Sequence, residues 1–271
     1  MLDLSYNGWV VDVNNFDIKT ATKQQAQKIG KLAVENMVVV IRNQDISPAQ
    51  QLQFCNYIGN IQPTDSERVK HISLESGVLR VTGQKNQHGE EGLFGHTSAL
   101  DWHANQASNY ERKPLIWLYG AENTKGSVTS WINNIKSYEA LPDDVKKEIE
   151  EIQITLGYKK NSYSSSSFFI EHHAQDRPFD LVHTNKAGFK GLYFPFLQIF
   201  GMKGIDDKRF NSIMSLLKNH ILQNRFRYDH HWQDGDVVIS EQWLSIHKRW
   251  HFDKMDRRVL HRIAFDYDKI Y

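Results

Sequence analysis

Short runs of β-branched and aromatic residues recur along most of this chain, and each run is only a few residues long. Such runs, bounded by turn residues, are typical of strands. They lie at residues 9–13, 37–41, 79–82, 114–119, 127–132, 181–183, 191–194, 225–228, 237–239 and 259–265. Helical spacing of apolar residues is confined to residues 22–36, 47–59, 135–141, 142–154 and 210–223. Many short strands with few helices predict a β-sandwich or jelly roll with helical additions.

Length and composition indicate one globular unit. The 271 residues are 40% hydrophobic and 12% aromatic, which is enough to bury a core and unlike a disordered chain. The chain has no internal repeats, and strand-like runs continue on both sides of a serine-rich stretch at residues 161–167. We therefore expect a single domain over residues 1–271, with this stretch as a flexible insertion at about residues 160–176.

Charge and cysteine content exclude several classes of partner. The formal net charge is +1, so the chain is not built as a polyanion binder and we expect no nucleic-acid partner. The single cysteine, Cys55, allows no intrachain disulfide and gives no sign of an oxidising compartment. Residues 1–13 do not resemble a signal peptide, and no stretch approaches the roughly 18 apolar residues of a membrane span. We expect a cytoplasmic protein without a membrane partner.

The C-terminal stretch, residues 241–271, combines a histidine with arginines between two strand-like runs. The simplest interpretation is a strand, a polar loop and a returning strand, which could direct His247, Arg258 and Arg262 into one cavity. Imidazole is a metal ligand, and a buried guanidinium pairs with a carboxylate through two hydrogen bonds. The alternative is a solvated basic face with aromatic packing, formed by Lys248, Arg249, Trp250, Phe252, Lys254, Arg257, Arg258 and Arg262.

A second histidine motif follows a long polar loop. Residues 84–100 are polar and contain glycine, which is typical of a lid or substrate loop. His103 and Asn105 come next, and at a strand edge two residues at this spacing can point the same way. A His-x-Asp/Glu pair with a distant histidine forms the facial triad of non-haem iron oxygenases, although here the third residue is Asn105. Asp101 is expected to be a loop or supporting residue rather than a replacement ligand.

Several motifs, taken in order, resemble the taurine/2,4-D dioxygenase family of Fe(II)- and 2-oxoglutarate-dependent oxygenases. The resemblance covers nearly the whole chain. Arg258 follows His247 by eleven residues and Arg262 comes four later, as in that family. The other matching segments are an apolar strand with Arg42, Gln44, Ser47, Gln51 and Gly59; Trp102-His103; residues 126–131 and 137–141; His183 with residues 191–193 and Gly201; and residues 232–236.

The resemblance implies a double-stranded β-helix of the clavaminate-synthase-like jelly-roll kind. It also implies Fe(II), 2-oxoglutarate and O2 as cofactors and co-substrates. Carried over by position, it implies that His103, Asn105 and His247 are the metal-binding catalytic residues. Arg258 would pair with the distal carboxylate of 2-oxoglutarate, and Thr129 would donate a hydrogen bond to it. Arg262 would support the co-substrate or hold an anionic substrate group.

Asn105 departs from the family pattern, because an amide oxygen is a poorer ligand than a carboxylate for a hard cation. Three consequences stay open. Asn105 coordinates weakly and the enzyme hydroxylates an unactivated C–H bond; or chloride occupies the position, as in related halogenases; or the chain is a non-catalytic ligand-binding member of the fold. A nucleic-acid-binding role for the basic C-terminal stretch is disfavoured by the near-neutral charge.

The sequence does not identify the substrate. We expect a small-molecule substrate. An anionic substrate and a homo-oligomer are the two options that the sequence leaves open. Position alone nominates a set of polar residues for substrate contact: Gln84, Asn86, Gln87, His88, Ser98, Gln106 and Arg262.

Overall fold

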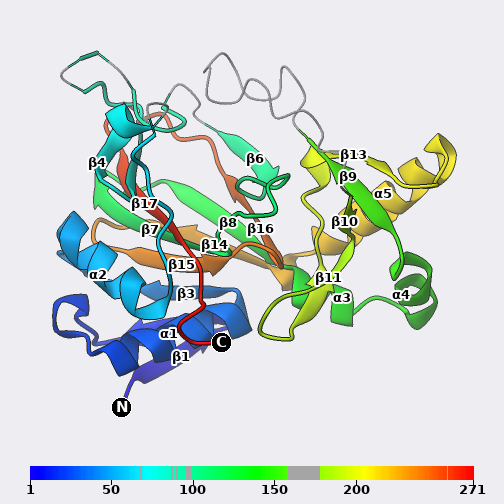
Figure 1. The fold of residues 1–271 in the computed structure, drawn as a ribbon, viewed down its shortest axis with the longest axis horizontal. Helices are drawn as coiled ribbons and strands as arrows, with labels where there is room; N and C mark the ends of the chain where they lie inside the picture. The colour runs from blue at the N-terminus through cyan, green and yellow to red at the C-terminus, as the bar shows by residue number, and fades with distance from the viewer. Residues whose placement is uncertain (67–68, 87, 90, 96–98, 158–177, 255) are drawn as a thin grey trace.

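The computed structural model describes residues 1–271 except 67–68, 87, 90, 96–98, 158–177 and 255 (Figure 1). The described residues form seventeen strands and five α-helices, so the chain is mainly β with helical additions, as predicted. Four short 3-10 helices lie between them, at Ile18–Thr20, Lys70–Ile72, Phe196–Gln198 and Asn224–Phe226. None of the described helices is long and apolar enough to cross a membrane.

An eight-stranded sheet is the largest element of the fold. Its strand order is β1-β2-β3-β15-β7-β17-β5-β4. The strands are β1 (Asp3–Asn7), β2 (Val10–Asn14), β3 (Val38–Ile41), β15 (Val237–Glu241), β7 (Leu115–Glu122), β17 (Val259–Phe265), β5 (Val78–Thr82) and β4 (Ser73–Glu75). Neighbours are antiparallel except β2 and β3, which are parallel.

A four-stranded antiparallel sheet packs against one face of the large sheet. Its order is β14 (Arg227–His231), β8 (Val128–Asn133), β16 (Ser245–Arg249) and β6 (Leu100–His103). A hydrophobic cluster joins the two sheets, with Val38 and Val40 of β3 on one side and Trp131 and Tyr228 on the other. Because side chains alternate across a strand, Val39 and Ile41 of the same run face the opposite side of the large sheet.

Two helices cover that opposite side. α1 (Lys23–Asn36) and α2 (Pro48–Ile58) lie along the face of the large sheet that points away from β8 and β16 (Figure 1). Each helix begins with a capping box, Thr22 with Gln25 and Ser47 with Gln50, in which the side chain of each residue bonds the other's backbone N–H. Such a cap contributes about 1 kcal/mol of stability. The large sheet is therefore buried on both faces, as its unbroken Val38–Ile41 run indicates.

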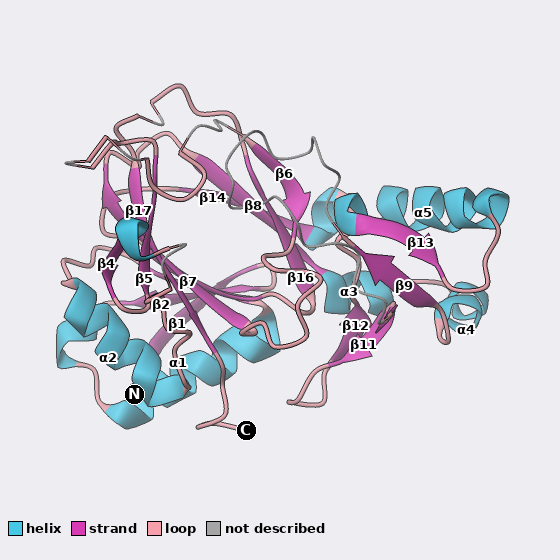
Figure 2. Ribbon diagram, turned by 45° about the horizontal axis from the view of Figure 1, so that its top comes forward, coloured by secondary structure: helices cyan, strands magenta, loops and turns pink. Residues whose placement is uncertain are grey.

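The remaining elements gather on the outer side of the four-stranded sheet (Figure 2). They are α3 (Asn134–Glu139), α4 (Asp143–Ile149), α5 (Asp207–Ile221), a sheet of β10 (Phe179–Asp180), β9 (Gln153–Leu156) and β13 (Ile199–Met202), and a hairpin of β11 (Val182–Thr184) and β12 (Lys190–Leu192). Their core includes Ile132 and Ile246, which point outward from β8 and β16. The four-stranded sheet thus has one face toward this core and the other toward the large sheet.

Two local predictions were wrong. The polar loop expected around His247 is strand β16, hydrogen-bonded to β8 on one side and β6 on the other. The helix expected over residues 142–154 ends at Ile149, and β9 begins at Gln153. Ile154 and Leu156 of β9 both enter the outer core. Because every second residue is buried there, the segment forms a strand and not the predicted helix. The predicted insertion at residues 160–176 lies wholly outside the described residues.

Candidate active site

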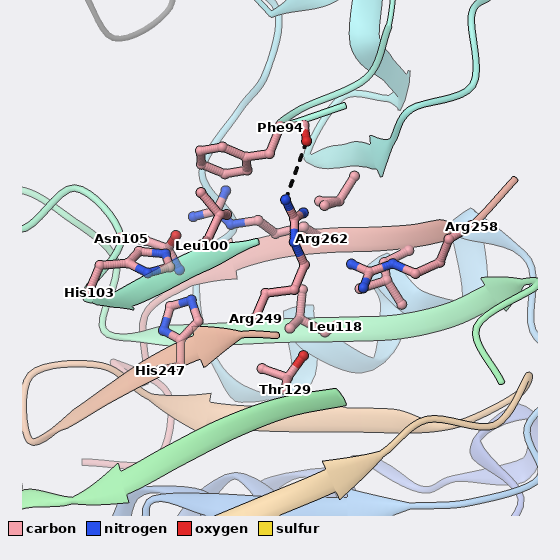
Figure 3. Close-up of a pocket in the computed structure, with 12 residues that line it drawn as sticks. Phe94, Leu100, His103, Asn105, Leu118, Thr129, His247, Arg249, Arg258 and Arg262 are labelled. Carbon is pink, nitrogen blue, oxygen red and sulfur yellow. Dashed lines mark hydrogen bonds between the residues drawn. The ribbon is translucent and has the colours of Figure 1, made fainter. Parts of the chain in front are cut away.

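A cavity of about 50 Å³ lies between the two sheets (Figure 3). Both sheets and the segments that join them contribute to its walls. Its lining residues are Val81, Phe94, Leu100, His103, Asn105, Leu118, Thr129, His247, Arg249, Arg258, Leu260 and Arg262. The cavity therefore collects six side chains that the sequence nominated: two imidazoles, an amide, a hydroxyl and two guanidinium groups.

The two histidines face each other from neighbouring strands. His103 ends β6 and His247 lies in the middle of β16, and the two are directly paired in the sheet register. Their ring centroids are 4.2 Å apart. Trp131 of β8 stacks on the far side of His247 at 6.3 Å, with ring planes 24° apart, and limits the movement of that imidazole. The two imidazoles are thus close enough to bind one cation.

Burial keeps both imidazoles neutral. Loss of hydration lowers the pKa of His103 to about 4 and holds the pKa of His247 well below its usual value. The nearby guanidinium groups of Arg249 and Arg262 act in the same direction. His103 Nδ1 lies 2.6 Å from the carbonyl oxygen of Asp101, so Nδ1 carries the proton and Nε2 keeps a lone pair for a metal.

Asn105 follows β6 in the turn that leaves the sheet, and it lines the same cavity. Gln198 fixes this turn through Ala104, the residue between the two polar side chains. Its Oε1 accepts from Ala104 N at 2.9 Å, and its Nε2 donates to Ala104 O at 3.1 Å. Arg112 Nη1 makes a longer contact, 3.4 Å, to the carbonyl oxygen of Asn105. The turn after His103 is therefore held by side chains from distant parts of the chain.

Among the described residues, none that lines the cavity offers a carboxylate as a third ligand beside the two histidines. Nowhere in the part of the chain that the structure describes do three His, Cys, Asp or Glu side chains come together as a metal site. Asp101 is the carboxylate nearest in sequence, but its Oδ1 pairs with Lys248 Nζ at 3.0 Å and its side chain is 58% exposed. Asp101 therefore supports His103 through its backbone, and the side chain beside the histidines is the amide of Asn105.

Two buried arginines approach the cavity from the large sheet. Arg258 precedes β17 and is 1% exposed, and Arg262 lies within β17 and is 8% exposed. Arg258 Nε and Nη1 and Arg262 Nε have no hydrogen-bond partner among the described atoms. Burial lowers the pKa of Arg258 to about 9 and that of Arg262 to about 10, so both stay charged at neutral pH. Buried N–H groups of this kind fit a ligand carboxylate.

Thr129 completes the polar lining from β8. Its hydroxyl oxygen accepts a hydrogen bond from Trp232 Nε1 at 2.9 Å. Because the oxygen is the acceptor in this bond, the hydroxyl hydrogen is left for a second partner. Both Thr129 and Trp232 are buried, so the indole fixes the position of the hydroxyl at the cavity wall.

Of the residues nominated for substrate contact by position that the structure describes, Arg262 lines this cavity and Gln84, Asn86, His88 and Gln106 do not. Gln84 Nε2 donates to the carbonyl oxygen of Arg257, and Asn86 Nδ2 donates to that of His71. Gln106 lies in the turn after Asn105, with a positive φ of 52°. Ser98 and Gln87 fall outside the described residues.

Sequence reasoning missed two residues of this site. Arg249 lines the cavity, whereas the sequence placed it only on a solvated basic face. Its position two residues after His247 would have revealed it, had the segment been predicted as a strand. Gln198, which fixes Ala104, lies 94 residues away along the chain and has no local sequence signal.

The two sheets thus enclose adjacent neutral imidazoles, which suit a divalent cation, and buried guanidinium groups, which suit an acidic ligand. The family model described as "Taurine catabolism dioxygenase TauD, TfdA family" matches residues 4–264. The chain therefore belongs to this family, and the resemblance found in its motifs is confirmed. It is an enzyme of the Fe(II)- and 2-oxoglutarate-dependent dioxygenase class, with O2 as the second co-substrate.

Individual relatives support the family at low identity. The chain is 22% identical over 273 residues to the alpha-ketoglutarate-dependent 2,4-dichlorophenoxyacetate dioxygenase of Cupriavidus pinatubonensis. The aligned region covers 92% of each protein. It is 22% identical to pentalenolactone F synthase of Streptomyces avermitilis, over 92% of this chain and 88% of that protein. Among solved structures, AAD-2 in complex with Mn(II) and N-oxalylglycine has a TM-score of 0.78 at 21% identity, with 97% of each chain covered.

Proposed function

We propose that this chain is a hydroxylase of small molecules, whose metal centre rests on His103 and His247, with the amide oxygen of Asn105 as a weak third ligand. The two facing sheets would be those of a double-stranded β-helix, or jelly roll, and residues 1–271 one oxygenase domain. The observation that carries the proposal is the pair of buried, neutral imidazoles in one cavity with Arg258 and Arg262, which have N–H groups without a hydrogen-bond partner among the described atoms.

The residues present fit both the metal and the co-substrate. His103 and His247 are neutral and hold lone pairs for a divalent cation. Arg258 provides buried N–H donors, which have no hydrogen-bond partner among the described atoms, for a distal carboxylate, and Thr129 provides a hydroxyl hydrogen. Bound iron with 2-oxoglutarate and O2 would supply the oxidation, which places one oxygen atom in the substrate and one in succinate and releases CO2.

The protein's own contribution is position and exclusion of water. Leu118, Leu260 and Val81 give the cavity apolar walls next to its charged groups, which strengthens every ion pair formed inside. Gln198 fixes the turn after His103 and Trp131 packs against His247, so the two sides of the histidine pair that would hold a metal are restricted in position.

Anaerobic titration with Fe(II) and 2-oxoglutarate tests this proposal, read by the visible charge-transfer band of the chelate. We expect a saturable band in the wild type and at least a tenfold weaker 2-oxoglutarate affinity in Arg258→Gln. Arg257→Gln is the matched control. The Arg257 side chain is next to Arg258 in sequence but 73% exposed, so its replacement should leave the band unchanged. A wild-type protein without a band, or equal affinity in both variants, would refute the proposed site.

Chlorination is a second candidate, favoured by the amide at Asn105, which leaves one ligand position without a negative charge. A halide on the metal would shift the charge-transfer band when chloride replaces an inert anion at constant ionic strength. No shift up to molar chloride would leave hydroxylation as the function.

A further inference from the structure

An aromatic series leads away from the histidine pair through the layer between the two sheets. Trp131 of β8 lies 6.3 Å from His247, measured between ring centroids, and Tyr228 of β14 lies 6.5 Å from Trp131. Trp9, in the turn between β1 and β2, lies 6.3 Å from Tyr228. Trp131 and Tyr228 are buried, whereas Trp9 is half-buried. Three rings therefore connect His247 with the protein surface in steps of nearly equal length.

Tyr228 has a proton acceptor within hydrogen-bond distance, which packing alone does not require. Its hydroxyl oxygen lies 3.0 Å from His230 Nδ1, and His230 Nε2 lies 3.1 Å from Asp236 Oδ2. A carboxylate only accepts, so Nε2 carries the proton of the imidazole and Nδ1 accepts from the phenol. Burial lowers the pKa of His230, which keeps the ring neutral and able to take a proton.

The polar end of this network is connected to solvent. Arg42 Nη1 donates to Asp236 Oδ2 at 2.8 Å, and the Arg42 side chain is 42% exposed. His230 and Asp236 themselves are fully buried. Ionisable groups in a buried layer cost stability, and hydroxylation as proposed makes no use of them. A role for Tyr228 that needs a proton acceptor accounts for their presence.

The chemistry of the two inner rings differs in a way that gives the series a direction. Loss of one electron makes a phenol a strong acid, so an acceptor at hydrogen-bond distance favours the oxidation of Tyr228. Trp131 Nε1 has no hydrogen-bond partner among the described atoms. An oxidised Trp131 therefore keeps its proton and takes an electron from Tyr228, whose own proton has a place to go.

We propose that Trp131, Tyr228 and Trp9 form an electron relay that reduces the metal site in turnovers where O2 reacts and no substrate is attacked. The inference rests on the proposed function, since the oxidant arises at the histidine pair. One electron passes from Tyr228 through Trp131 to the metal site, and the phenol proton moves to His230 Nδ1, which leaves a neutral tyrosine radical. A soluble one-electron reductant such as ascorbate returns the electron through Trp9, and His230 returns the proton. The relay protects the cavity side chains from oxidation.

Freeze-quench electron paramagnetic resonance in the absence of substrate tests the relay. The Fe(II) protein with 2-oxoglutarate is mixed with oxygenated buffer, and the tyrosine radical is quantified against the succinate formed. We expect a radical in the wild type and about tenfold less in Tyr228→Phe. His230→Gln should show a similar loss, because an amide accepts the hydrogen bond but not the proton. Tyr267→Phe, which alters a buried tyrosine on the helix-covered side of the large sheet, should leave the radical unchanged.

Covalent damage to the cavity is a second readout. Peptide mass spectrometry after substrate-free turnover measures the oxygen atoms added to lining residues such as Phe94, per succinate formed. We expect several-fold more damage in Tyr228→Phe than in the wild type or Tyr267→Phe. Ascorbate should lower the damage in the wild type and have less effect in Trp9→Leu. Equal damage in the wild type and Tyr228→Phe would mean that Tyr228 does not protect the cavity.

Succinate and the charge-transfer band of the chelate, measured in the same samples, separate the two proposals. If the wild type forms neither, the proposed function fails and the relay fails with it. If succinate forms but the wild type shows no tyrosine radical, or Tyr228→Phe shows as much radical as the wild type, the relay is refuted and the proposed function stands. A normal chelate band also shows that each variant is folded and loaded.

Discussion

Gln198 hydrogen-bonds both backbone polar groups of Ala104, the residue that separates His103 from Asn105. Both residues are buried, so no water can replace these bonds. Gln198 itself lies at the end of a 3-10 helix, on an element that does not belong to either sheet around the cavity. The spacing between the two candidate ligands therefore depends on packing between the four-stranded sheet and the outer layer.

Replacing Gln198 by methionine keeps its volume and removes both hydrogen bonds. The buried N–H of Ala104 then has no acceptor, and we expect a loss of about 1–3 kcal/mol in the free energy of unfolding. A looser turn should also weaken Fe(II) affinity by about tenfold at temperatures where the variant stays folded. Gln198→Glu keeps the acceptor for Ala104 N and should recover part of both effects. Gln24→Met, on the exposed face of α1, is the control. Unchanged Fe(II) affinity in Gln198→Met would show that Gln198 has no positioning role.

Asn105→Asp should strengthen metal binding. The change adds a negative charge beside two neutral imidazoles and within a cavity that contains three guanidinium groups. A carboxylate is a better ligand than an amide for a hard divalent cation, and we expect Fe(II) affinity to rise at least tenfold. Asn105→Ala should lower it only a few-fold, because the amide is a weak ligand. Anaerobic Fe(II) titration measures both, and an aspartate variant that binds no more tightly than the wild type would place this side chain outside the metal's reach.

Thr129 gives a prediction about the co-substrate. Its oxygen accepts from Trp232 Nε1, and its hydrogen is the group that can bond a carboxylate, which only accepts. Thr129→Val removes that donor and leaves the buried indole N–H without an acceptor. We expect about tenfold weaker 2-oxoglutarate affinity and a loss of about 1–3 kcal/mol in stability. Thr129→Ser keeps the hydroxyl and should retain both properties. A valine variant with wild-type affinity would mean that the distal carboxylate binds elsewhere.

The order of motifs allowed much of the fold and site to be predicted from sequence. Thr129 and Arg258 lie on or directly beside strands that the apolar pattern located, at residues 127–132 and 259–265. His103 and His247 lie on β6 and β16, which that pattern did not locate and which only the motifs indicated. β16 shows the physical reason. Its inward residues, His247 and Arg249, are polar because they face a polar cavity, so the alternation that marks an ordinary strand is inverted there.

Contacts between distant segments were beyond sequence reasoning. Gln198 contacts a residue 94 positions away, and no periodicity identifies a partner at that separation. Arg112 is a further example: its guanidinium stacks 4.0 Å from the ring of Trp243 and 4.5 Å from that of Tyr193, and it also contacts the turn at Asn105. Both residues are buried polar groups whose partners are set by tertiary packing. A single sequence shows such residues only as polar positions that resemble surface ones.

Glu241 should make stability depend on pH. It ends β15 in a fully buried position, with Oε2 accepting from Leu244 N at 2.7 Å and Oε1 without a partner among the described atoms. Burial raises its pKa from 4.5 to about 7. Because the folded state favours the protonated carboxyl, this contribution to stability is complete below about pH 4.5 and is lost as pH rises through 7. At 1.36 kcal/mol per pKa unit, the loss is about 3 kcal/mol.

Glu241→Gln removes this titration and keeps an oxygen acceptor for Leu244 N. Chemical denaturation at pH 5 and pH 8 should show that the wild type loses about 1–3 kcal/mol more than the variant between the two values. At pH 8 the variant should be the more stable protein. Glu75→Gln, at an exposed position on β4, controls for the general effect of losing a carboxylate and should follow the wild type. Parallel curves for the wild type and Glu241→Gln would show that Glu241 is ionised in the folded state throughout this range.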